Sequence, residues 1–256
     1  MTLEPFLLAG VSGAIVAFLL TAFGGGGSVL ATPLLLYWVG VSDPHKAIGT
    51  SAVAVAVNAL FGLAAQARAG RVKWPCASVF AAAGLTGALL GAEIAKRIDG
   101  RQLLIGFAIA MAAVGAAMLR PGAKGGDPAV RLDRARVIRL TPVGFLTGAA
   151  SGFFGIGGGF LIAPGLMAAT GMTLANAAAS SLLSVALFGA ATSVSYAASG
   201  LVDWPLAGAL IAGGMAGVAL GAAIAPRLAA RAALARRLFA AMILVVSAYV
   251  AWRALA

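Results

Sequence analysis

The chain has 256 residues, of which 62% are hydrophobic and 10% charged, and its mean hydropathy is +1.03. Soluble domains are roughly 45–50% apolar and about 25% charged. The composition therefore excludes a soluble globular enzyme, a disordered chain and a disulfide-stapled secreted domain. It predicts an all-α fold, a polytopic bundle of transmembrane helices.

The net charge of +11 does not indicate a nucleic-acid-binding protein. The 18 Lys and Arg residues lie almost entirely between the apolar segments, where the positive-inside rule places them. The single cysteine, Cys76, excludes a disulfide framework and a CxxC metal or redox site. We expect no nucleic-acid partner, no metal and no other cofactor.

Five apolar segments are expected in each half of the chain. In the first half they cover residues 5–22, 28–40, 47–67, 75–92 and 102–119. A polar, basic linker over 120–139 follows, and the second half has segments at 140–154, 160–170, 174–199, 205–226 and 238–251. The predicted domains are a first transmembrane repeat (1–119), the linker (120–139) and a second repeat (140–256).

The second segment of each half is shorter than the rest. A helix needs about 20 residues to cross a bilayer core of ~30 Å, and these segments have fewer. Each also contains a proline, Pro33 or Pro164, which kinks or breaks a helix. We expect half-helices or re-entrant pieces here, so that each half has four long helices and one short Gly/Pro-interrupted helix.

The two halves resemble each other in sequence. At an offset of 130, residues 70–97 match 200–227 at 14 of 28 positions, including Trp74/Trp204, Pro75/Pro205 and Arg97/Arg227. Internal duplication is typical of secondary transporters. If the short segments cross the membrane, the repeats are inverted and Lys and Arg divide 13 to 5 in favour of the linker side. If they re-enter, the repeats are parallel and the division is 10 to 8. The positive-inside rule favours the inverted arrangement, with the linker cytoplasmic.

A glycine run precedes each short segment. The runs are Gly24-Gly25-Gly26-Gly27-Ser28 and Gly155-Ile156-Gly157-Gly158-Gly159. Glycine lets the backbone turn and lets a ligand approach it, and a helix that begins after such a turn directs free N–H groups and its positive dipole end at the break. Two such breaks can hold an anion between them without a charged side chain. Tight helix packing through small residues is the alternative explanation.

Hydroxyl side chains form a second repeated pattern. Thr50-Ser51 and Ser180-Ser181 lie early in the third segment of each half, and Asn58 follows two turns after Thr50 on the same helical face. These hydroxyls either bind a ligand or bond to backbone carbonyl groups. The repeat equivalent of Asn58 is Phe188, so any role of Asn58 is one-sided.

Ionisable residues are absent from the interiors of the ten segments. Glu93 lies deepest, and its spacing to Arg97 suits a local ion pair near the membrane surface. The usual mark of a proton relay, an intramembrane Asp, Glu or His, is missing. No acid, base and nucleophile cluster together, so we do not expect an enzyme.

These motifs resemble the TauE/SafE family of membrane permeases, named for the export of sulfite and organosulfonates. The resemblance rests on FGGGGSVLATP at 23–33 with AIGTS at 47–51, repeated as GIGGGFLIAP at 155–164 with AAASS at 177–181. It implies transport of a small sulfur-containing anion across the bacterial cytoplasmic membrane. The second repeat has Ala179-Ser180-Ser181 in place of the family's Gly-Thr-Ser pattern.

We therefore predict a transporter that binds its anion between the two glycine breaks and works by alternating access. Besides this anion, membrane lipids are the expected partners. An anion channel and a non-transporting membrane subunit remain alternatives. The predicted substrate-binding residues are Gly24, Gly25, Gly26, Gly27, Ser28, Pro33, Thr50, Ser51, Asn58, Gly155, Gly157, Gly158, Gly159, Pro164, Ser180 and Ser181.

Overall fold

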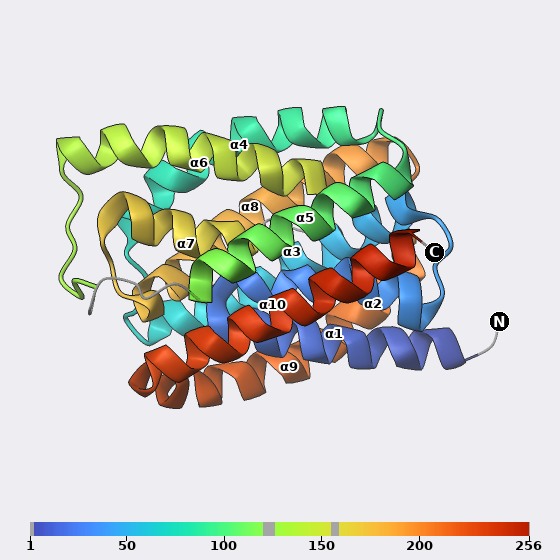
Figure 1. Ribbon diagram of the computed structural model, residues 1–256. Helices are drawn as coiled ribbons and strands as arrows, with labels where there is room; N and C mark the ends of the chain where they lie inside the picture. The colour runs from blue at the N-terminus through green and yellow to red at the C-terminus, as the bar shows by residue number, and fades with distance from the viewer. Residues whose placement is uncertain (1–2, 120–125, 155–158, 256) are drawn as a thin grey trace.

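The computed structural model describes residues 3–119, 126–154 and 159–255 and is helical almost throughout (Figure 1). Eight helices are long and apolar enough to cross a membrane, which confirms the predicted polytopic helical fold. They are α1 (Glu4–Phe23), α3 (Pro44–Arg68), α4 (Trp74–Ala95), α5 (Gly100–Leu119), α6 (Arg134–Phe154), α8 (Leu174–Ala198), α9 (Trp204–Ala230) and α10 (Ala232–Leu255).

Two shorter helical stretches complete the described fold. The first runs without interruption through a 3-10 helix, η1 (Gly24–Leu30), the α-helical turn α2 (Ala31–Leu34) and a π-helical turn, η2 (Leu35–Val39). The second is α7 (Gly159–Thr170). Neither proline breaks its helix, since Pro33 lies within α2 and α7 continues through Pro164. The irregular backbone of the first stretch comprises the 3-10 helix that begins at the glycine run and the π-helical turn that follows Pro33.

Segment ends predicted from charge differ from the helix ends. The last segment was expected at 238–251, whereas α10 begins at Ala232 and includes Arg237. Likewise α6 begins at Arg134, within the predicted linker. Charged residues do not end a helix. They mark where it leaves the apolar layer, and the backbone hydrogen bonds continue beyond that level.

Three outer pairs of helices pack around a central pair. Helices α3 and α8 lie at the centre, with 72% of the apolar stretch of each buried, against 33–44% in the other six long helices. Around them α1 packs on α9, α4 on α6, and α5 on α10. In Figure 1, α1 begins and α10 ends at one end of the bundle, here named the terminal end. Helix α5 ends and α6 begins at the opposite, linker end.

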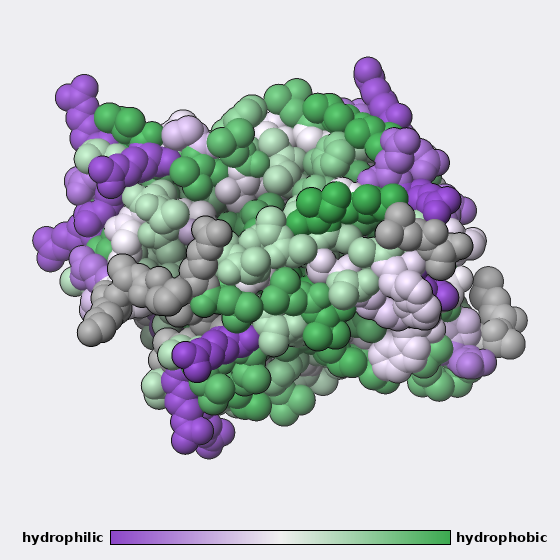
Figure 2. Space-filling model, viewed as in Figure 1, coloured by the Kyte–Doolittle hydropathy of each residue, from purple (hydrophilic) through white to green (hydrophobic). Residues whose placement is uncertain are grey.

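Polar and apolar residues are distributed over the surface as in a protein that spans a bilayer. On the face shown in Figure 2, hydrophilic residues gather at the two ends of the helices, with a largely apolar band between them. Trp38, Trp74, Trp204 and Trp252 are exposed, as aromatic residues at a membrane–water interface are. The chain is a multi-pass membrane protein.

Glycines let the helix pairs approach to backbone contact. A methyl group built on Gly217 of α9 would overlap the carbonyl oxygen of Ala14 on α1. A methyl group on Gly87 of α4 would overlap the carbonyl oxygen of Phe145 on α6. Gly87 and Gly217 are equivalent positions at the offset of 130. The glycine series that the two halves share therefore serves helix packing.

The first prediction concerns this packing. Gly217→Ala should lower the free energy of unfolding by about 1–3 kcal/mol, the usual cost of overpacking a well-filled contact. The matched control is Gly208→Ala on the same helix, because a methyl group at Gly208 meets nothing within 4 Å. Thermal unfolding of the purified protein in one detergent compares the two. Equal Tm values for the two variants would show that the α1–α9 contact is looser than described.

Candidate functional site

The two short helical stretches meet inside the bundle, at a place here named the crossing. Helix η1 packs against α7, and both contact the central helix α8. Leu30 and Leu34 of the first stretch share one apolar cluster with Ile162 and Leu166 of α7. The segments that follow the two glycine runs thus meet between the central helices and the outer helices.

Three glycines of the first run make close contacts that exclude a side chain. Gly24 has φ +76°, a conformation that favours glycine, and its backbone lies against the backbone of Ala178 on α8. A methyl group on Gly26 would overlap the ring of Phe239 on α10, and one on Gly27 would overlap the backbone of Leu20. Packing alone accounts for these glycines, so their role in ligand binding stays a prediction.

The second run lies mostly outside the described residues. This applies to Gly155, Gly157 and Gly158, whereas Gly159 is the first residue of α7. Of the other predicted site residues on the short helices, Ser28 and Pro33 are buried and Pro164 is half-buried. These four predicted site residues therefore all lie on the two short helical stretches.

Thr50 and Ser180 make a reciprocal pair of hydrogen bonds. The backbone N–H of Asp203, which caps α9, donates to Thr50 Oγ1 at 2.9 Å. The backbone N–H of Lys73, which caps α4, donates to Ser180 Oγ at 2.9 Å. The two donors, Lys73 and Asp203, are 130 positions apart, and so are the two acceptors, Thr50 and Ser180. The start of α3 therefore lies beside the end of α8, and the start of α8 beside the end of α3, so the central helices are antiparallel.

Ser51 contacts the short helix directly. Its Oγ lies 3.0 Å from Oγ1 of Thr32 on α2 and also donates to the carbonyl of Ile48 at 3.0 Å. All three residues are at most 1% exposed. Ser181 Oγ donates to the carbonyl of Ala178 at 2.8 Å, beside the backbone of Gly24. The second hydroxyl of each pair therefore lies next to a short helix or a glycine break, while the first caps a neighbouring helix.

Thr32 was missed from the sequence. Its equivalent in the second half, at the offset of 131, is Ala163, so the repeat comparison does not point to it. The available signal was a hydroxyl one residue before Pro33 inside an otherwise apolar stretch.

Asn58 fills a place that a phenyl ring fills in the other half. Its side chain lies against the backbone of Gly214 on α9, and the ring of Phe188 lies in the same way against Gly84 on α4. Asn58 is 1% exposed, and its Oδ1 has no hydrogen-bond partner among the described residues. The two equivalent positions therefore make the same contact with different side chains, and a one-sided role of Asn58 stays a prediction.

Two aromatic pairs involve the residues that precede the two glycine runs in the sequence. Phe23, which precedes the first run, stacks on Phe239 of α10 with ring centroids 5.4 Å apart. Phe154, which precedes the second run, contacts Phe107 of α5 with centroids 5.7 Å apart. Phe23 and Phe154 are 131 positions apart, and Phe107 and Phe239 are 132 apart. Each pair joins a residue of one half to a residue of the other.

The charged groups lie away from this crossing. Glu93 forms an ion pair with Lys96 at 2.8 Å and accepts a hydrogen bond from Ser195 Oγ at 2.7 Å. The expected Glu93–Arg97 pairing is wrong, because Lys96 at the i+3 position reaches the same carboxylate one residue earlier. The buried polar side chains of the described residues are all neutral: Ser, Thr, Asn and Gln. In the described part of the chain, no three His, Cys, Asp or Glu residues are grouped as metal ligands.

This architecture defines a class of protein: a multi-pass membrane protein in which, over the described residues, two short helical stretches meet inside a bundle of eight long helices. Residues 9–250 match the family described as sulfite exporter TauE/SafE. The chain belongs to the TauE/SafE family, as its motifs suggested.

Several relatives are similar over most of the chain. A "probable membrane transporter protein" of Xylella fastidiosa strain Temecula1 is 48% identical, with 99% of this chain and 97% of the relative covered. The "probable membrane transporter protein YunE" of Bacillus subtilis is 28% identical, covering 86% of this chain and 88% of the relative. No solved structure matches.

The second prediction separates capping from ligand binding. Thr50→Val should lower the free energy of unfolding by about 1 kcal/mol, because the Asp203 N–H loses its acceptor. Ser180→Ala should have the same effect at Lys73. The control is Ser193→Ala, which removes only a bond to the carbonyl of Gly189 within its own helix. Unfolding midpoints and anion affinity are measured together. Weaker anion binding at unchanged stability in Thr50→Val would assign this hydroxyl to the ligand instead.

Proposed function

We propose that the chain is a permease for a small sulfur-containing anion such as sulfite or an organosulfonate. The observation that carries the proposal is the crossing of two short helices in an interior whose buried polar groups are neutral. The substrate class is taken from the family name. Neutral donors suit an anion that must also be released, because a buried unpaired cation would bind it much more tightly.

The proposed donors are backbone N–H groups at the starts of η1 and α7. The hydroxyls of Thr32, Ser51 and Ser181 join them by turning away from their present partners within the protein. The first N–H groups of a helix have no partner within it, and the helix dipole is positive at that end. A bound sulfite or sulfonate offers three oxygens as acceptors, which several weak donors can share. The site is therefore proposed at the crossing, on the side where Thr32 contacts Ser51.

The contacts between the halves support alternating access as the mechanism. The hydrogen bonds at Thr50 and Ser180 link the halves at opposite ends of the bundle. The pairs Phe23–Phe239 and Phe107–Phe154 lie beside the two breaks. We propose that these pairs open in turn as α5 and α10 tilt, so that one break is exposed at a time.

The third prediction tests the aromatic pair over the first break. In a Cys76→Ser background, Ser28→Cys gives a single thiol at a position that is fully buried. Phe239→Ala should raise the rate at which a water-soluble maleimide labels this thiol severalfold, since the ring no longer covers Gly26. Phe61→Ala, which removes an exposed ring on α3, is the control. Equal labelling rates with and without the Phe239 ring would remove it from the access path.

The fourth prediction tests transport itself. Purified protein in vesicles should take up labelled sulfite or a short alkylsulfonate in a saturable manner and should show counterflow. Ser51→Ala should raise the half-saturating concentration, while Ser193→Ala should leave it unchanged. Flux that stays linear with concentration and lacks counterflow would indicate a channel. No flux of sulfite, sulfate or sulfonate with folded protein would contradict the proposed substrate class.

A further inference from the structure

A second place suited to an anion lies at the terminal end of the bundle. A pocket of about 390 Å³ opens there between η2, α5 and α10. Its polar lining residues are Tyr37, Ser42, Arg101 and Arg253. Pockets for small molecules have volumes of about 300–1,000 Å³, so this one is large enough for a small organic anion.

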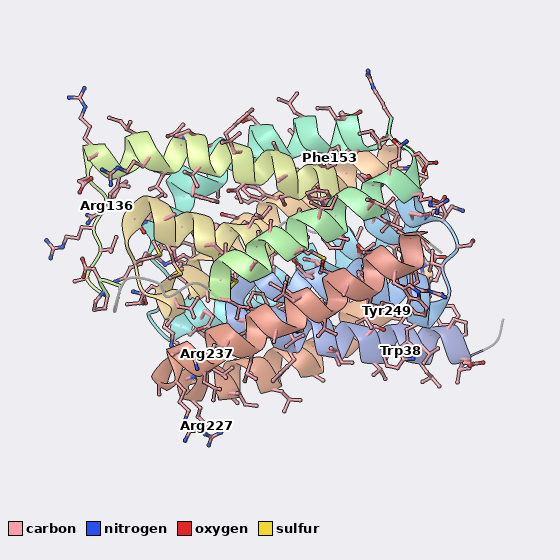
Figure 3. The ribbon with its side chains drawn as sticks, viewed as in Figure 1. Trp38, Arg136, Phe153, Arg227, Arg237 and Tyr249 are labelled. Atoms are coloured by element: carbon pink, nitrogen blue, oxygen red, sulfur yellow. The ribbon has the colours of Figure 1, made fainter. Side chains whose placement is uncertain are left out.

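The two arginines are held in defined positions. Arg253 lies over the ring of Tyr37 at 5.1 Å from its centroid, and Tyr249 packs edge-on against the same ring at 5.3 Å. Arg101 Nε donates to the carbonyl of Ala254 at 2.6 Å. Because Arg253 is stacked on this ring, the N–H groups in the plane of its guanidinium can bind a planar or tetrahedral anion. Figure 3 shows Tyr249 and Trp38 at this end, far from Arg136, Arg227 and Arg237 at the linker end.

The neighbouring carboxylates are engaged by the backbone. Asp43 Oδ1 accepts from the N–H of His45 at 2.9 Å, and Asp99 Oδ1 accepts from the N–H of Arg101 at 2.9 Å. Both therefore act as helix caps.

The rest of the wall is apolar. Leu36, Val41 and Leu104 line it beside the arginines. An anion with a charged head and a short hydrocarbon part, such as an alkylsulfonate or an alkylcarboxylate, matches both surfaces, whereas sulfate matches only the arginines. The first short helix joins the pocket to the crossing, because Leu36 and Tyr37 belong to η2 and Thr32 to the preceding turn.

We propose that this pocket is a docking site for small organic anions, which pass between it and the crossing along the first short helix. The proposal deepens the proposed function and relies on it for the passage, but binding in the pocket is independent of transport. An anionic lipid headgroup has the same chemistry as a free organic anion, and the experiment distinguishes the two.

The fifth prediction is tested by binding of labelled ethanesulfonate to purified full-length protein in zwitterionic nanodiscs. Arg253→Gln should weaken binding about tenfold, the loss expected for one charge-assisted contact of ~1.4 kcal/mol. Arg253→Lys should lie between this variant and the parent, because it keeps the charge but loses the stacked fork. Arg237→Gln, which removes an arginine at the linker end, should leave affinity unchanged.

Lipid competition and transport complete the test. Phosphatidylglycerol that abolishes ethanesulfonate binding and co-purifies with the parent, but not with Arg253→Gln, would identify a lipid site and overturn the proposal. So would equal affinities in Arg253→Gln and the parent. Pocket binding with no flux of any anion would leave the docking site standing and contradict the proposed transport. Flux with an unchanged half-saturating concentration in Arg253→Gln would contradict passage through the pocket.

Discussion

Two hydrogen bonds at opposite ends of α3 and α8 define how the two halves fit together. At each end a hydroxyl early in one central helix accepts from the backbone N–H that begins an outer helix of the other half. A buried N–H without a partner is costly, and in hydrocarbon water does not supply one. Because the two bonds are reciprocal, they set the antiparallel register of α3 and α8. The outer pairs α1–α9 and α4–α6 then form between halves as well, and their glycines make equivalent contacts at Gly87 and Gly217. These equivalences support inverted repeats.

The same constraint explains where the helices are irregular. Non-helical backbone at membrane depth is tolerated only where protein buries it or a cavity solvates it. At Gly24 the backbone turns with positive φ against Ala178, and at Gly26 the ring of Phe239 covers it. An aromatic ring is the movable part of this arrangement, because it can rotate away at a smaller cost than a helix backbone can shift. A break closed by side chains from the other half links access to the relative position of the halves.

The sequence predicted those features that depend on local composition. Hydropathy located ten helical segments, and the repeated glycine runs located the crossing of the short helices. It did not assign roles within the pairs Thr50-Ser51 and Ser180-Ser181, because adjacent hydroxyls look alike until the partner helix is placed. Thr32 and the aromatic pairs were missed for the same reason, since their partners lie 19 to 216 positions away in the chain. The sequence did not predict that Pro33 and Pro164 would lie within continuous helical stretches, because neighbouring turns of other helical types accommodate them.

The pocket at the terminal end and the crossing in the interior differ in charge. At the terminal end, Arg101 and Arg253 form a cationic pocket at the level of exposed Trp38 and Trp252, where water still screens their field. Inside, the described buried polar groups are neutral, so an anion that passes from the pocket to the crossing, as proposed, exchanges the charge of Arg253 for hydroxyl and N–H dipoles. Strong attraction in a screened, wet pocket and weak attraction in a dry interior can come out similar in free energy. Because the two states would then be nearly isoenergetic, the anion could move in either direction, and the gradient would set the direction of net flux. An arginine placed at the crossing would remove this balance, because the dry interior would hold the anion far more tightly than the rim.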